Sequence, residues 1–329
     1  MIRYILKRLI QMIPVILCVA VLIFTIMYFC PGDPTNTMLS SEATDVEREA
    51  LRTQMGLNDP FIVQLGKYLY QLFIKFDFGT SYMTGKPVIE ELAVRFPRTL
   101  VFAVSVMIVQ LLVGIPLGVV AATHQNGFGD RICMLIALLG VSVPNFWLAM
   151  ELIILFSLKL GLLPSHGIGG IEYWILPIFC NCFGGIAMQA RQTRSGMLEC
   201  IRSDYVVTAR AKGLSEKKIL YRYALPNAMI PLIQTIGDGF GTALGGTVII
   251  ENVFSIPGVG TYMTAAVNMR DYPIIRGSVV ILAIAFSLVM LLVDCTFAFV
   301  DPRIKAQYEN QNKQWNLPFR RAGKEAANG

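Results

Sequence analysis

Three carboxylates lie inside long apolar stretches of the chain, where an ionised side chain costs free energy. These residues are Glu151, Asp238 and Asp294. In a membrane they could carry protons or cations, as in a channel or an ion-gradient-driven secondary transporter. They could also make hydrogen bonds within a helix bundle, and the lack of Lys, Arg or His at the same depth in the bilayer favours this structural role. A role for Asp238 in lining a cavity stays open.

Histidines and cysteines offer little for catalysis or metal binding, because the chain has only two His and seven Cys. Most cysteines fall inside apolar runs, so we interpret them as small apolar residues rather than as disulfides. No metal site is predicted, since His124 and His166 are far in sequence from the closely spaced Cys180 and Cys182. Residues 79–87 resemble a P-loop but have one residue too many between the glycines and a Pro in place of Ser/Thr. We therefore expect no catalytic residue, metal or cofactor in this chain, and any ATP and Mg²⁺ to be bound by a partner.

The composition is that of a membrane protein. Of the 329 residues, 54% are hydrophobic and 15% charged, against about 25% charged in a typical soluble domain. Such a chain is too apolar for disorder or for a soluble fold. A spanning helix needs about 20 mostly apolar residues. Six stretches meet this requirement: 9–30, 100–122, 132–160, 173–190, 229–250 and 277–300.

Individual stretches differ in character. The first is longer than the core of a signal peptide, so we expect it to remain as a helix. Pro144 lies inside the third and predicts a kink or tilt. The fourth is the weakest, because it contains Asn181 and Gln189. Together the stretches predict an all-α membrane protein with six transmembrane helices.

Positive charge predicts the orientation, since Lys and Arg favour the cytoplasmic side. They concentrate in segments 1–8, 191–228 and 301–329, which indicates that both termini are cytoplasmic. Segment 31–98 is then outside, where apolar residues at helical spacing predict a small helical cap. Asp33-Pro34 and Asp59-Pro60 are typical of helix starts. The predicted organisation is a first helix in 1–30, an extracytoplasmic helical loop in 31–98, a five-helix core in 99–300 that includes cytoplasmic loop 191–228, and a cytoplasmic tail in 301–329.

A ladder of small residues marks the fifth stretch, where Gly237, Gly241 and Gly245 are each four residues apart. This spacing lets another backbone approach closely. The ladder could serve packing within the chain, or it could line a pathway at a subunit interface beside Asp238. Residues 114 and 118 form a weaker glycine pair in the second stretch.

Cytoplasmic loop 191–228 is predicted to fold as two short helices. It carries eight Lys/Arg and three acidic residues. Ser203 or Asp204 can cap a first helix, which Gly213 ends. A second helical stretch runs from Ser215 to Pro226. An ordered basic pair of helices on this face indicates a docking surface for a protein. Nucleic acid is disfavoured, because the basic residues lack a set of exposed stacking aromatics and the loop is tethered at the bilayer.

This loop resembles the cytoplasmic Glu-Ala-Ala loop of permease subunits from bacterial ABC importers. Ala209, Gly213, Leu225 and Pro226 match the pattern, whereas its Glu and Ile positions hold other residues, Val and Tyr at 207 and 223. Residues 208–214, Thr-Ala-Arg-Ala-Lys-Gly-Leu, resemble the dipeptide/oligopeptide (and nickel) group, and in it the first permease subunit. Further motifs extend the resemblance over about residues 1–306: 31–34, 77–81, 251–260, 270–273 and 301–303.

The resemblance implies a type I ABC importer permease in the bacterial cytoplasmic (inner) membrane. Such a subunit is not an enzyme, contacts membrane lipid, and works with a second homologous permease, two ATPase subunits and an extracytoplasmic substrate-binding protein. Peptides are the implied substrates. The implied ATPase-coupling residues are Asp204, Tyr205, Thr208, Ala209, Arg210, Ala211, Lys212, Gly213, Leu214, Leu225 and Pro226. Candidate pathway or interface residues are Gly237, Asp238, Gly241, Gly245 and Glu251. The alternative is an ion-driven carrier or channel using Glu151, Asp238 and Asp294.

Overall fold

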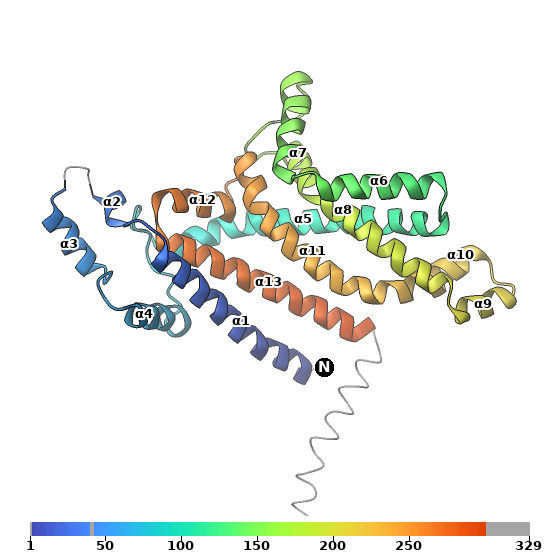
Figure 1. Cartoon of the computed structure of the whole chain (residues 1–329), viewed down its shortest axis with the longest axis horizontal. Helices are drawn as coiled ribbons and strands as arrows, with labels where there is room; N and C mark the ends of the chain where they lie inside the picture. The colour runs from blue at the N-terminus through green and yellow to red at the C-terminus, as the bar shows by residue number, and fades with distance from the viewer. Residues whose placement is uncertain (1, 40–42, 301–329) are drawn as a thin grey trace, which may run out of the picture.

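The computed structural model describes residues 2–39 and 43–300. Within these residues the chain consists of helices and their connections, with one isolated β-bridge between Thr80 and Pro87. The predicted cytoplasmic tail 301–329 lies outside the described residues. Figure 1 shows long helices grouped side by side, with helices α2–α4 at one end of the molecule and α9–α10 at the other. The predicted all-helical fold is confirmed for the described part of the chain.

Four helices are long and apolar enough to cross a membrane. They are α1 (Ile2–Phe29), α5 (Val88–Thr123), α8 (Glu172–Ile201) and α13 (Tyr272–Val300). A bent pair of helices gives a fifth candidate span among the described residues. Helix α11 (Leu225–Val253) covers the predicted stretch 229–250 but is not among these candidates, because its glycines and Asp238 lower its mean hydropathy. The structure thus supports four to five spans by length and composition.

The predicted span 132–160 is broken rather than merely kinked. Helix α6 (Phe128–Ser142) ends before Pro144, and α7 (Asn145–Leu152) begins after it. The helix continues from α7 as a wide π-helical segment, Ile153–Lys159, and the two halves are bent by 101°. Proline disfavours a helical conformation in the residue before it, and Val143 is extended, with ψ 122°. The bend therefore falls at the residue that precedes Pro144.

The second predicted span starts earlier than the hydropathy pattern suggested. Helix α5 begins at Val88, inside the segment predicted to be an extracytoplasmic loop, and it continues through Pro97 and Pro116. It packs along α8 at small residues. A Cβ atom on Gly118 would lie 2.6 Å from the carbonyl oxygen of Ala190, so only glycine permits this approach.

The predicted cap contains three helices: α2 (Thr35–Met38), α3 (Asp45–Gln54) and α4 (Phe61–Ile74). Both predicted helix starts are confirmed, since α2 follows Asp33-Pro34 and α4 follows Asp59-Pro60. Thr44 begins α3 with a capping box, in which its hydroxyl accepts from the Glu47 amide and the Glu47 carboxylate accepts from the Thr44 amide.

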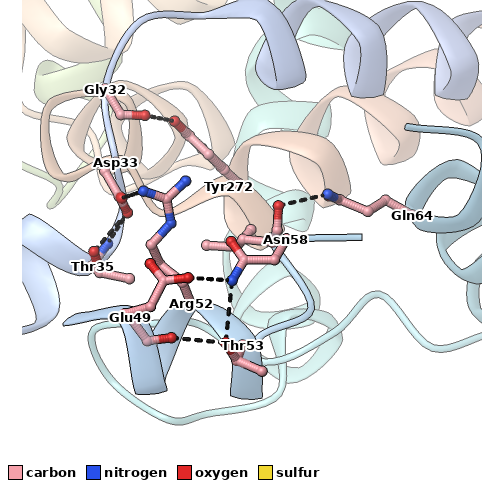
Figure 2. Close-up of polar contacts among 10 residues, drawn as sticks. Gly32, Asp33, Thr35, Glu49, Arg52, Thr53, Asn58, Gln64 and Tyr272 are labelled. Atoms are coloured by element: carbon pink, nitrogen blue, oxygen red, sulfur yellow. Dashed lines mark hydrogen bonds and ion pairs between the residues drawn. The ribbon is translucent and has the colours of Figure 1, made fainter. Parts of the chain in front are cut away.

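Polar contacts attach the cap to the long helices (Figure 2). Asp33 forms an ion pair with Arg52 of α3 at 3.2 Å and accepts hydrogen bonds from the amide and hydroxyl of Thr35. The Tyr272 hydroxyl donates to the carbonyl oxygen of Gly32 at 3.1 Å. The end of α1, the start of α13 and α3 are therefore linked through residues 32–35.

The main apolar core lies where α5, α8 and α11 meet. Phe102, Cys180, Cys182 and Ile250 are among its fully buried residues. All seven cysteines lie in the described residues and all are free thiols, as predicted. Cys180 and Cys182 both pack into this core.

Candidate functional site

Residues 204–219 form a compact pair of helices beyond the end of α8. Helix α9 (Asp204–Ala211) and α10 (Glu216–Ile219) enclose an apolar core of Val206, Ala209 and Ile219, with Leu214 packed against it. Gly213 sits in the turn between them with φ +73°, a conformation that favours glycine. The predicted helix, glycine turn and second helix are all present.

The turn is also closed by an ion pair. The Arg210 guanidinium donates to both carboxylate oxygens of Glu216, at 2.7 and 3.2 Å. These hydrogen bonds lower the pKa of Glu216 from its ordinary value. Ser203 precedes α9, but its hydroxyl donates to the Cys200 carbonyl oxygen instead of capping the helix. The predicted capping by Ser203 is therefore wrong in its contact, although the helix begins where expected.

Most of the coupling residues implied by the resemblance face outward. Ala209 is buried and Leu214 partly buried, so these two hold the pair of helices together. The exposed residues are Asp204, Tyr205, Thr208, Arg210, Ala211, Lys212, Gly213 and Pro226. Three exposed apolar side chains accompany them, Val207, Tyr221 and Tyr223. The surface is thus mixed, with apolar and charged side chains together.

The second helical stretch does not end at Pro226, contrary to expectation. Helix α10 widens into a π-helical turn, Leu220–Ala224, and continues directly into α11. A proline ring clashes with the carbonyl four residues earlier in a regular α-helix, and the wider turn lies just before Pro226. Leu225 and Pro226 form the first turn of α11, where a missing amide proton is tolerated.

Helix α11 contributes one wall of an open groove of about 540 Å³. Asp238 is exposed in this wall, and Leu282 and Phe286 of α13 form the opposite side. The groove is mainly apolar apart from Asp238 and a threonine. Its other lining residues, all from α11, are Gly241, Thr242, Leu244, Gly245 and Val248.

The glycine ladder divides between packing within the chain and the wall of the groove. A Cβ atom on Gly237 would lie 2.6 Å from the Met290 sulfur, and one on Gly241 would lie 2.6 Å from the Phe286 ring. These two glycines therefore permit α11 to pack on α13. Gly245 has no other atom within 4 Å of such a Cβ and borders the groove.

Glu251 is fully buried and does not border the groove. Its carboxylate accepts hydrogen bonds from the Thr99 hydroxyl at 2.6 Å, the Gly260 amide at 2.7 Å and the Thr261 amide at 3.3 Å. Through these contacts it fixes the turn between α11 and α12 (Val259–Met269) against α5. Its geometry is that of a structural residue.

The three carboxylates from the apolar stretches are not brought together. Glu151 is exposed on α7, and neither it nor Asp294 borders the groove of Asp238. Asp294 forms an ion pair with Arg8 of α1 at 3.0 Å. Sequence reasoning missed this partner, because Arg8 was considered only as one of the basic residues of segment 1–8 that indicate orientation.

A second ion pair was also missed. Asp130 at the start of α6 is 3% exposed and accepts two hydrogen bonds from the Arg194 guanidinium of α8. The amide of Asn126 donates to the same carboxylate at 2.8 Å. The two partners are 64 residues apart, and no local pattern in the sequence indicates such a contact.

The described residues thus define a polytopic membrane protein with a groove along α11 and an ordered pair of helices at its end. Residues 114–306 match the family described as binding-protein-dependent transport system inner membrane component, and residues 1–103 match its N-terminal counterpart. The chain belongs to this family of transport-system membrane components.

Similar proteins agree with that assignment. A glutathione transport system permease protein from Salmonella paratyphi A is 39% identical over 305 residues, which cover 93% of this chain and 99% of the relative. A dipeptide transport system permease protein from Alkalihalophilus pseudofirmus is 37% identical and covers 93% of this chain and all of the relative. A solved structure of the MetNI methionine ABC transporter has a similar fold, with TM-score 0.57 and 20% identity over 65% of this chain and 97% of that one.

Membership in this family has direct consequences. The chain is a non-catalytic permease subunit of an ABC importer, and ATP hydrolysis takes place in partner subunits. It is a multi-pass inner membrane protein that works with ATPase and substrate-binding components. Family membership therefore favours an ABC importer over the ion-driven carrier that the three intramembrane carboxylates had suggested as an alternative.

Proposed function

We propose that this chain forms half of the translocation pathway of an ATP-driven importer of peptides. Relatives named for dipeptide and glutathione transport support the substrate class. A second, homologous permease would supply the other half, two ATPases would bind on the cytoplasmic side, and an extracytoplasmic binding protein would deliver the peptide. The ATP and Mg²⁺ would be held by the ATPases.

The proposed topology has six crossings with both termini in the cytoplasm. Helices α1, α5, α8 and α13 account for four of them, the bent pair α6–α7 for one, and α11 for the sixth. Family membership supports α11 as a crossing despite its modest hydropathy, because its groove would face a partner subunit or an aqueous pathway rather than lipid. The cap α2–α4 and the pair α9–α10 would then lie on opposite sides of the membrane, in agreement with their positions at opposite ends of the molecule in Figure 1.

The observation that carries the coupling role is the exposed apolar surface of the pair α9–α10. This unit has its own core, yet Val207 of α9 is 56% exposed, and Tyr221 in the π-helical turn that follows α10 is 58% exposed. Apolar side chains gathered on the surface of an ordered unit mark contact with a protein or a membrane. Residues 204–226 would therefore dock on an ATPase, and their displacement would move α11, which forms one wall of the groove.

The experiment combines isolation of the complex with one substitution. The tagged chain is purified from its membranes in mild detergent, the accompanying proteins are identified by mass spectrometry, and peptide uptake is measured in liposomes with ATP. We expect a second permease and two ATPases, and uptake that requires ATP. Uptake without any ATPase would contradict the proposal and make Asp238 the residue to study for ion coupling.

Gly213→Asp tests the coupling role itself. Nothing lies within 4 Å of a new Cβ atom, but φ +73° strains any side chain there, so the substitution disturbs the turn and also places a charge on the proposed docking face. We expect normal insertion and loss of ATP-dependent uptake. Glu151→Gln, on exposed α7, is the control and should leave uptake unchanged. Normal uptake by well-expressed Gly213→Asp protein would overturn the coupling assignment.

A further inference from the structure

Helix α4 of the cap is apolar on two opposite faces. One face packs on the long helices, where Leu72 is buried in a cluster with Ala20 of α1 and Val280 of α13. Tyr68, Leu69 and Phe73 pack against the same cluster. A helix that is apolar all round is usually covered on every side, so the opposite face requires an explanation.

The opposite face is exposed. Ile62 is 72%, Tyr70 54% and Ile74 65% exposed, and Phe76, just beyond the helix, is 78% exposed. Val63 lies on the same side and is also exposed. Large apolar side chains gathered on one face of a helix mark contact with a protein or a membrane.

The depth of α4 points to the membrane. Leu72 shares a cluster with Ala20, which lies nine residues before Phe29, the last residue of α1. At 1.5 Å per residue, α4 reaches about 13 Å below the end of that helix. Both Ala20 and Val280 lie within candidate membrane spans. In Figure 1, α4 accordingly lies beside α1 rather than beyond its end.

The start of α4 also packs on the apolar end of α1. The Phe61 ring at the start of α4 contacts the rings of Tyr28 and Phe29, with centroids 5.0 and 6.0 Å apart. Ile26 and Phe29 of α1 are themselves exposed, as expected for a helix that faces lipid. Aromatic side chains favour the membrane–water interface.

Charged residues complete the pattern. Lys67 is paired with Asp59, and the Lys75 ammonium lies 5.6 Å from the centre of the Tyr70 ring. Lysines beside an apolar face can keep the charge at the headgroups while their stems lie along the acyl region. Helix α3 differs, since its sequence is mostly polar and Val46 is its large exposed apolar residue.

We propose that α4 is embedded in the lipid interface, with its Ile62–Tyr70–Ile74 face against acyl chains and its Leu72 face against α1 and α13. The membrane thus anchors the cap at a fixed depth. The assignment to the outer leaflet rests on the proposed orientation, whereas lipid contact itself does not.

Photo-crosslinking identifies the occupant directly. The photoreactive amino acid p-benzoylphenylalanine is placed singly at positions 62, 70 and 74 of the full chain. The assembled transporter is reconstituted in nanodiscs of phosphatidylethanolamine and phosphatidylglycerol, irradiated and analysed by mass spectrometry. The control is the same residue at position 46, where Val46 is 79% exposed on α3. Only variants that still assemble are compared, and three sites keep the test informative if one variant fails to fold.

We expect lipid adducts at 62, 70 and 74, several-fold more abundant than at 46. Adducts to a protein at these positions would overturn the proposal and identify a protein that covers α4. Lipid adducts no more abundant than at position 46 would overturn it equally. The readout is independent of peptide uptake, so failure of the proposed transport function would leave this result unaffected.

Discussion

Glu251 accepts a hydrogen bond from the Thr99 hydroxyl at 2.6 Å, although the two residues are 152 positions apart in the chain. The same hydroxyl accepts a hydrogen bond from the amide of Val259 at 2.8 Å. A single buried carboxylate and one threonine therefore join α5, the end of α11 and the start of α12.

We predict that Glu251→Ala strongly destabilises the protein. It would leave the Thr99 hydroxyl and two backbone amides without an acceptor in a buried site, at about 1–3 kcal/mol for each unsatisfied group. The midpoint of thermal unfolding in detergent measures the effect. Glu151→Ala on exposed α7 is the matched control, and equal shifts for the two variants would contradict the structural role of Glu251.

Asp130 and Arg194 should behave as a coupled pair. Arg194→Met leaves the carboxylate of Asp130 buried without its cation, which costs about 3–5 kcal/mol in comparable sites. Adding Asp130→Asn removes the buried charge and should recover part of that loss. A double-mutant cycle from unfolding midpoints measures the coupling, and additive effects would show that the pair does not interact as described.

The three ladder glycines should respond differently to Ala. At Gly237 and Gly241 the new methyl group meets Met290 and Phe286 at 2.6 Å, so each variant should lose stability by about 1–3 kcal/mol through overpacking. Gly245→Ala has open space and should keep stability or gain slightly from helix propensity. Gly245→Trp should also fold but impair uptake, because it fills the groove. Uptake assays and unfolding midpoints separate these outcomes.

Much of the fold follows from local patterns in the sequence. Apolar runs predict the long helices, Asp-Pro pairs predict the starts of α2 and α4, and Gly213 predicts the turn between α9 and α10. These features depend on the backbone preferences and hydropathy of neighbouring residues. The same reasoning placed the pair α9–α10 correctly within loop 191–228.

Other features depend on contacts between distant parts of the chain. Nothing near Arg194 in sequence indicates that it pairs with Asp130. Glu251 was grouped with the candidate pathway residues, and only its contact with the distant Thr99 shows that its role is structural. The start of α5 at Val88 was missed because hydropathy marks only the apolar part of a helix. Pro226 was assigned as a helix end because the preceding π-helical turn, which makes room for it, has no clear sequence signal.

Acid should loosen the cap through Asp33. Burial alone would raise the pKa of this carboxyl, but hydrogen bonds from Thr35 and the charges of Arg52 and Arg48 outweigh it and hold the pKa below 3.8. The stabilisation is therefore complete above the unfolded value near 3.8 and is lost as pH falls through the lower folded pKa. Because the ion pair is partly exposed, we expect less than about 1 kcal/mol.

Hydrogen exchange of residues 43–56 measures this effect after correction for the intrinsic pH dependence of exchange. In the native protein, protection of these amides should decrease once the pH is lowered below the ordinary pKa range of Asp. Asp33→Asn should show reduced protection at neutral pH and little further change in acid. Acid sensitivity that persists unchanged in this variant would assign the effect to another carboxyl.

The unbroken path from α10 through the π-helical turn into α11 makes residues 216–253 one continuous helical segment, whose axis bends between α10 and α11 in Figure 1. Its near end carries part of the exposed docking face, its middle carries Asp238, and its far end is fastened to α5 by Glu251. A displacement of the near end therefore meets no loop before it reaches the groove wall, and the Thr99 hydrogen bond opposes movement of the far end.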